Sequence, residues 1–251
     1  MVSSTSNIAM PVPWNLLPAT FVDRPNRFLT HIRVDDQVHP AHLPDPGRLA
    51  ELLLPGVALR VQYHKKWETI RPARKTAYTV HLVRRPDDGG WVSVNTLLPN
   101  RFVAFLLEER RLPFLADWSL AGREVTEGHS RFDFQLRRGA DSLFLEVKSV
   151  TFVEQGVAQF PDAVTARGAR HARHLAQLAR EGQATMILFV IQRDDARSFR
   201  PMWQRDPNLG HALVEAHSAG VAIHAIKLAV SPESCTYLGE VSVDLSIPGG
   251  V

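Results

Sequence analysis

Two runs of alternating apolar residues, separated by a short polar stretch, occupy residues 130–150, SRFDFQLRRGADSLFLEVKSV. This alternation predicts a β-hairpin that turns around residues 138–140, with one face of each strand in a core. The apolar residues are Phe132, Phe134 and Leu136 in the first strand and Leu143, Leu145 and Val147 in the second. They must share one face, because a slip of one residue would turn a whole face toward solvent. Phe134 is therefore expected opposite Leu145.

The same parity brings two carboxylates together on the solvated face, with Asp133 opposite or diagonal to Glu146. Like charges at opposed positions destabilise a sheet, so a compensating group is expected. A divalent cation such as Mg²⁺ is the strongest candidate, since hard cations prefer carboxylate oxygens. Lys148 points to the same face, where it could neutralise the pair or orient a water beside a metal. An ordinary solvated face with alternating Glu and Lys remains the competing interpretation.

The chain as a whole predicts an α+β protein with two domains. Residues 1–12 read as a loose tail, and short strands over 13–90 predict a compact β-barrel or sandwich. Residues 91–251 mix helices with strands. The expected strands include 27–34, 57–66, 76–85, 122–127, 131–137, 142–150 and 186–192, and the expected helices are 100–112, 161–182 and 208–220.

Composition narrows the class of protein. The 251 residues are 45% hydrophobic, and the pI of about 9.3 allows a polyanionic partner without requiring one. The single cysteine, Cys235, excludes an intrachain disulfide and a cysteine-based zinc site. The longest uncharged apolar run, ATMILFVI, is too short to span a bilayer, and no secretory signal is apparent. We therefore expect a cytoplasmic protein without a membrane partner.

Two basic clusters are candidates for contact with nucleic acid. The first lies on the helix expected over 161–182, and the second lies between strands of the first domain, near Tyr63, Trp67 and Tyr78. The candidate residues are Arg167, Arg170, His171, Lys65, Lys66, Arg74 and Lys75, with Arg131 added from the hairpin. Arginine binds phosphate with two parallel hydrogen bonds, and barrels of this size bind nucleic acid with basic grooves and stacking aromatic residues. Exposed basic surfaces without a ligand remain the alternative.

The order Asp, then E-x-K on the next strand, then a basic helix resembles the core of PD-(D/E)xK nucleases. A longer resemblance is to the SfsA family, sugar fermentation stimulation protein A. It rests on NRFL (26–29), PGRL (46–49), VNTLLPNR (94–101), SRFDF (130–134), LEVKSVT (145–151), FPDAVTARGARH (160–171) and DP (206–207), which recur in this order. The chain departs from the family pattern at LPDPG (43–47), where the family reads close to CPNTG, and at Phe105, where an acidic residue is frequent.

The resemblance implies an N-terminal OB-like barrel followed by a restriction-endonuclease-like, PD-(D/E)xK mixed α/β domain. It also implies binding of DNA with little sequence preference. Carried onto this chain, Asp133 and Glu146 are metal ligands for Mg or Mn, Lys148 is the catalytic lysine, and Glu124 is a further acidic ligand.

The sequence and the resemblance together leave three functions open. The first is a metal-dependent deoxyribonuclease, with Asp133, Glu146 and Lys148 as its catalytic residues. The second is a non-catalytic, DNA-binding regulator of sugar (maltose) catabolism that keeps the fold without turnover. The third is an oligosaccharide- or RNA-binding OB module joined to a structural domain.

Overall fold

The structure, a computed structural model, describes residues 8–65, 67, 69 and 74–249. The chain divides into two compact units. The barrel unit contains Met1–Leu98, Gln192–Asp194 and Leu228–Leu238, and the mixed unit contains Pro99–Ile191, Asp195–Lys227 and Gly239–Val251. The first unit therefore extends beyond residue 90, where we placed the end of the first domain, and includes β7 (Trp91–Ser93).

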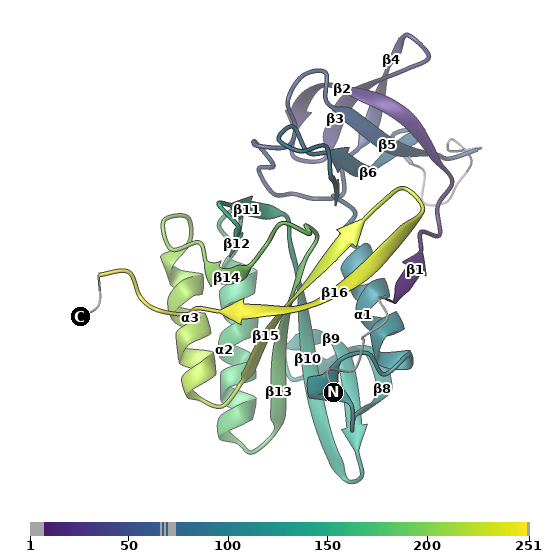
Figure 1. Cartoon of the computed structure of the whole chain (residues 1–251). Helices are drawn as coiled ribbons and strands as arrows, with labels where there is room; N and C mark the ends of the chain where they lie inside the picture. The colour runs from purple at the N-terminus through teal and green to yellow at the C-terminus, as the bar shows by residue number, and fades with distance from the viewer. Residues whose placement is uncertain (1–7, 66, 68, 70–73, 250–251) are drawn as a thin grey trace, which may run out of the picture. The chain divides into compact units, whose positions relative to one another are not determined.

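The barrel unit is a closed barrel of short strands (Figure 1). The strands are β2 (Leu16–Asn26), β3 (Leu29–Val34), β4 (Gln37–His42), β5 (Ala58–Tyr63) and β6 (Tyr78–Arg84). Around the barrel they pair in the order β2-β3-β4-β6-β5-β2, and β4–β6 is the parallel pair. This is the Greek-key order of an OB-fold, as the resemblance implied. Its core consists of fully buried aliphatic residues such as Ile32, Leu59 and Val80.

Sequence patterning missed two strands of this barrel and one before it. Prolines at positions 18, 25 and 40 interrupt the alternation of β2 and β4, although both strands pair over several residues. Residues 9–11, expected in a loose tail, form β1 (Ala9–Pro11). This strand pairs antiparallel with Ser234–Thr236 of β16 (Ser234–Val243).

The mixed unit is built on a sheet with the order β8-β9-β10-β13-β15. Its strands are β8 (Ser119–Glu127), β9 (Ser130–Arg138), β10 (Asp141–Val150), β13 (Ala184–Ile191) and β15 (Ala222–Val230). The pairs from β8 to β10 are antiparallel, and those from β10 to β15 are parallel. A smaller group of strands contains β11 (Phe152–Glu154), β12 (Val157–Phe160), β14 (Ser198–Pro201) and the second half of β16. The α+β class is thus confirmed.

In the described part of the chain, three α-helices flank the main sheet, together with the short 3₁₀ helix η1 (Pro113–Leu115). In Figure 1, α2 (Ala166–Arg180) and α3 (Pro207–Ser218) lie side by side on one face, and α1 (Leu98–Glu108) lies on the other. Apolar residues of β13 are buried between these layers, as its uninterrupted apolar sequence predicted. In the part of the chain that the structure describes, no helix is long and apolar enough to cross a membrane.

The helix expected over 161–182 begins later than predicted. Pro161 follows a cis peptide bond and precedes the helix, rather than lying in its first turn. Thr165 is the N-cap, and its hydroxyl accepts a hydrogen bond from the Gly168 N–H at 3.0 Å. This start determines which residues of α2 point toward the sheet.

Candidate functional site

The hairpin has the register that its apolar pattern predicts. Leu145 is paired with Phe134, and the turn lies between Arg138 and Asp141. Phe132 is an exception, because it packs with Phe144 and with the rings of α2 rather than with the face of Phe134. The alternation of buried residues in β9 continues to Phe132, but β9 no longer pairs with β10 beyond Phe134–Leu145.

Asp133 lies where the two strands separate. Its Oδ2 accepts a hydrogen bond from the Val147 N–H at 2.8 Å, so the side chain takes the place of a backbone acceptor. Its Oδ1 accepts one from Asn100 Nδ2, on α1, at 2.6 Å. Burial raises the pKa of Asp133, and the like charge of Glu146 raises it further. The expected convergence of the two carboxylates is therefore present, while the contribution of Asn100 was missed.

Glu146 is buried, with 5% of its surface exposed, so the prediction of a solvated face was wrong. Residues of α2 cover this face of β10, including His171, whose Nδ1 donates to Glu146 Oε1 at 2.7 Å. Lys148 Nζ donates to the same oxygen at 2.5 Å. Burial by itself would raise the pKa of Glu146, but the hydrogen bond from His171 and the charge of Lys148 outweigh it and leave the pKa lowered.

The second oxygen of Glu146 suggests what this cluster could bind. Oε2 is buried and has no hydrogen-bond partner among the described residues. An unpartnered buried carboxylate oxygen is costly, and a cation would satisfy it. The donors offered by Asp133 and Glu146 are oxygens, which suit Mg²⁺ or Mn²⁺. The residues present therefore fit a hard divalent cation held by two carboxylates, with water or substrate oxygens completing its coordination.

Glu124 does not join this pair. Its side chain is 68% exposed and lies 3.7 Å from Arg131, another exposed residue. Within the described residues, no group of three or more His, Cys, Asp or Glu side chains is arranged to hold a metal ion. A site made from Asp133 and Glu146 would thus have two protein carboxylates, as Mg²⁺ sites that also use substrate phosphates commonly do.

The basic helix divides into an exposed and a buried set. Arg167 and Arg170 are exposed at the start of α2, where phosphate could reach them. His171, which the sequence placed in the same basic cluster as Arg167, is buried, and so is His174. His174 Nδ1 lies 2.7 Å from Ser130 Oγ. His171 therefore acts on the Glu146 carboxylate, and its predicted contact with nucleic acid is not supported by its position.

Two cavities of the barrel unit contain residues of the basic cluster or the aromatic residues near it. One, of about 650 Å³, is lined by Arg74 and Lys75 together with the exposed ring of Phe28. The other, of about 300 Å³, is lined by Tyr63, Trp67 and Tyr78, the aromatic residues noted in the sequence. The two cavities share Pro40 and Thr76. Lys65 is exposed, and Lys66 lies outside the described residues.

The first cavity lies at the edge of the barrel that OB-folds use for ligands. Its residues come from the β2–β3 turn, from β4 and from the β5–β6 connection. Arg74 donates to Thr79 Oγ1 at 2.6 Å, which anchors its guanidinium beside the cavity. His42 also lines the cavity, and burial lowers its pKa. A surface that combines cations with exposed rings suits single-stranded nucleic acid.

Comparison with known proteins gives consistent matches over nearly the whole chain. The family described as "SfsA N-terminal OB domain" matches residues 22–94, and the one described as "Sugar fermentation stimulation protein RE domain" matches residues 97–234. A sugar fermentation stimulation protein homolog of Desulforamulus reducens is 42% identical over 90% of this chain and 91% of its own. One from Moorella thermoacetica is 40% identical over 93% and 99%.

One solved structure also matches nearly the whole chain. It is described as the structure of Pyrococcus furiosus SfsA in complex with Ca²⁺. The TM-score is 0.83, the sequence identity is 31%, and the match covers 94% of this chain and 98% of the other.

Proposed function

Because the chain belongs to the sugar fermentation stimulation protein family, we propose that it binds DNA with little sequence preference and hydrolyses phosphodiester bonds with Mg²⁺ or Mn²⁺. The observation that carries the proposal is the buried Glu146 Oε2, which has no partner among the described residues and lies on a cluster with Asp133 and Lys148. The Pyrococcus furiosus relative, described in complex with Ca²⁺, supports a site for a hard cation in this family.

Each residue of the cluster has a distinct part in such a reaction. Asp133 and Glu146 would hold the cation, which supplies polarisation of the phosphoryl oxygen and a more acidic bound water. The Lys148 ammonium donates a hydrogen bond to Glu146 Oε1 in this structure. In the reaction it would orient the attacking water or stabilise charge on the phosphate. Asn100 fixes one oxygen of Asp133, and His171 fixes one oxygen of Glu146, so both carboxylates are held in place before substrate binds.

The barrel unit supplies a surface for the DNA strand in this proposal. Arg74 and Lys75 would contact phosphates, while Tyr63, Tyr78 and Phe28 would stack on bases. Phosphates and base faces occur in every sequence, so this mode of contact gives affinity with little sequence preference. On α2, the exposed side chains of Arg167 and Arg170 would contact the backbone in the same way.

Cleavage and binding should be measured together on labelled single-stranded, nicked and duplex DNA with Mg²⁺ or Mn²⁺. We expect Asp133→Asn and Lys148→Met to lose cleavage roughly 100-fold or more, while affinity for DNA changes little. Asp141→Asn is the matched control, because this exposed carboxylate of the same hairpin pairs only with Arg138 in the described residues. Equal cleavage by wild type and both site variants would exclude the catalytic role.

A second function, a non-catalytic DNA-binding regulator, is favoured by a different observation. Glu146 Oε1 already accepts hydrogen bonds from Lys148 and His171, and the described residues offer no third metal-binding side chain. A protein of this kind would bind DNA as tightly with a chelator as with Mg²⁺, and none of the DNA substrates would be cut. In the same assay, only variants of the basic clusters, Arg74 and Lys75 in the barrel unit and Arg167 and Arg170 on α2, would then have an effect.

A further inference from the structure

A separate cavity in the mixed unit, of about 460 Å³, contains none of the residues of the carboxylate cluster. Its walls come from β12, β14, the start of α3 and the segment after β16. Its volume lies in the range of about 300–1,000 Å³ that is typical of small-molecule sites. The carboxyl ends of the parallel strands β12 and β14 open toward it, which is the edge where sheets of this type commonly bind ligands.

Trp203 forms the centre of the cavity, and the sequence of α3 provides the space for it. A Cβ atom at Gly210 would lie 2.4 Å from Cζ3 of the indole, so only glycine lets the ring approach the helix. Glycine inside a helix costs roughly 0.5–1 kcal/mol relative to alanine. His211 meets the indole edge-on at 5.3 Å. The ring is thus held in place by α3 at the expense of helix stability.

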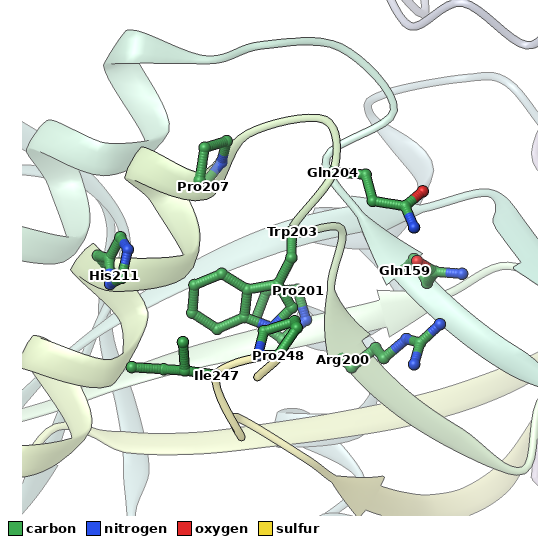
Figure 2. Close-up of a pocket in the computed structure, with 9 residues that line it drawn as sticks. All are labelled: Gln159, Arg200, Pro201, Trp203, Gln204, Pro207, His211, Ile247 and Pro248. Atoms are coloured by element: carbon green, nitrogen blue, oxygen red, sulfur yellow. The ribbon is translucent and has the colours of Figure 1, made fainter. Parts of the chain in front are cut away.

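The cavity brings together the polar groups of Trp203, Gln159 and Arg200. The indole N–H of Trp203 is buried and has no hydrogen-bond partner in the described structure. Gln159 and Arg200 are register partners on β12 and β14, so their side chains leave the same face next to each other. Figure 2 shows Arg200, Gln159 and Gln204 on one side of the indole, with the apolar Ile247 on the other.

We propose that this cavity binds a single unpaired nucleotide, with its base beside Trp203 and its phosphate at Arg200. A base offers a planar ring for the indole and carbonyl oxygens that can accept from the buried N–H. The amides of Gln159 and Gln204 each present a donor and an acceptor, as the edges of bases do. Among the described residues that line the cavity none is acidic, and the guanidinium of Arg200, which also interacts with the nearby carboxylate of Asp244, is the cation that a phosphate would meet.

Calorimetric titration of the full chain with thymidine 5′-monophosphate and with thymidine tests this site. Arg200→Gln should weaken the monophosphate roughly tenfold and leave thymidine unchanged, because it removes only a charge-assisted hydrogen bond. Trp203→Phe should weaken both ligands, because it removes the indole N–H. Arg137→Gln is the matched control, since Arg137 is also an exposed arginine of the mixed unit but does not line the cavity.

Two results would overturn the proposal: wild type without saturable binding of the monophosphate, or equal weakening by the Arg200 and Arg137 variants. If Trp203→Phe fails to fold, the exposed Arg200 still provides the decisive comparison. The nucleotide could be free in solution or could be one unit of a DNA strand. Competition between the monophosphate and a short oligothymidylate distinguishes these two sources. Displacement of the monophosphate identifies a unit of a DNA strand, and its absence identifies a free nucleotide. Both results are independent of whether the carboxylate cluster cleaves DNA.

Discussion

His171 illustrates how one side chain holds a buried charge in position. Its Nδ1 and the Lys148 ammonium share a single oxygen of Glu146, which is nearly inaccessible to solvent. A buried carboxylate that loses a donor keeps its desolvation cost and loses part of its compensation. The motif FPDAVTARGARH, which reads as a basic helix in the sequence, therefore contributes a structural partner of the carboxylate cluster as well as exposed arginines.

We expect His171→Gln to lower the free energy of unfolding by about 1–3 kcal/mol, because the buried oxygen of Glu146 loses a well-placed donor. Urea unfolding followed by circular dichroism at neutral pH measures the change. His217→Gln, an exposed position of α3, should stay within about 0.5 kcal/mol of wild type. If the two variants were equally stable, His171 would not support Glu146 in the way proposed.

Helices α2 and α3 of the mixed unit are joined at their first turns by one carboxylate, that of Asp206. Asp206 is 3% exposed, and its Oδ1 accepts from the Leu209 N–H at 3.0 Å as the N-cap of α3. Its Oδ2 accepts from the Thr165 N–H at 2.8 Å, where α2 begins. The DP motif at 206–207 thus sets the start of both helices, including the one that carries His171 to Glu146.

Asp206→Ala should therefore cost more than the loss of an ordinary cap. One cap is worth about 1 kcal/mol, and a second buried N–H without a partner adds about 1–3 kcal/mol, so we expect about 2–4 kcal/mol. Thr165→Ala is the matched comparison, because its side chain caps only Gly168, and it should cost about 1 kcal/mol. Thermal and urea unfolding of both variants measures the difference. Equal losses would show that the bridge to α2 contributes nothing.

The elements differ in how far the sequence could predict them. The hairpin register around Phe134 and Leu145 followed from the expected turn at 138–140 together with apolar parity, which excludes a slip of one residue. The hydrogen bond from Asn100 to Asp133 and the burial of Glu146 could not be predicted in this way, since both depend on helices that pack against the sheet from distant parts of the chain. Local periodicity carries no information on such contacts. Strands with internal prolines, such as β4, were missed because their local pattern is weak. Pairing with neighbouring strands of the barrel stabilises them in spite of it.

At the scale of the whole molecule, we expect two histidines of the barrel unit to make the free energy of unfolding depend on pH. Burial lowers the pKa of His42 and of His64, and the charge of Arg74 lowers both further. The unfolded chain then takes up protons near pH 6.5 while the folded chain does not. The contribution of these two histidines to the free energy of unfolding is complete above about pH 6.5. It is lost as the pH falls toward their lowered pKa values in the folded state.

We expect the unfolding temperature to fall between about pH 8 and about pH 5.5, and to fall less in a His42→Gln, His64→Gln double variant. Differential scanning calorimetry at the two pH values measures both slopes. His217→Gln should keep the slope of wild type, because this exposed histidine lies outside the barrel unit. A double variant that lost as much stability as wild type on acidification would rule out these two histidines as the source.

Binding of DNA by this chain should depend strongly on salt, because the proposed contacts are mainly with phosphates. Each contact with a single strand contributes about 0.7 to the slope of log affinity against log salt concentration. We expect Lys75→Gln in the barrel unit and Arg167→Gln on α2 each to reduce the slope by about that amount, whatever the DNA sequence. Arg137→Gln removes an exposed cation of the hairpin that we do not assign to DNA, and should leave the slope unchanged. Fluorescence anisotropy over a series of salt concentrations measures all four slopes. If only Lys75→Gln lowered the slope, DNA would contact the barrel unit without α2, and cleavage by the carboxylate cluster would lose its means of holding the strand.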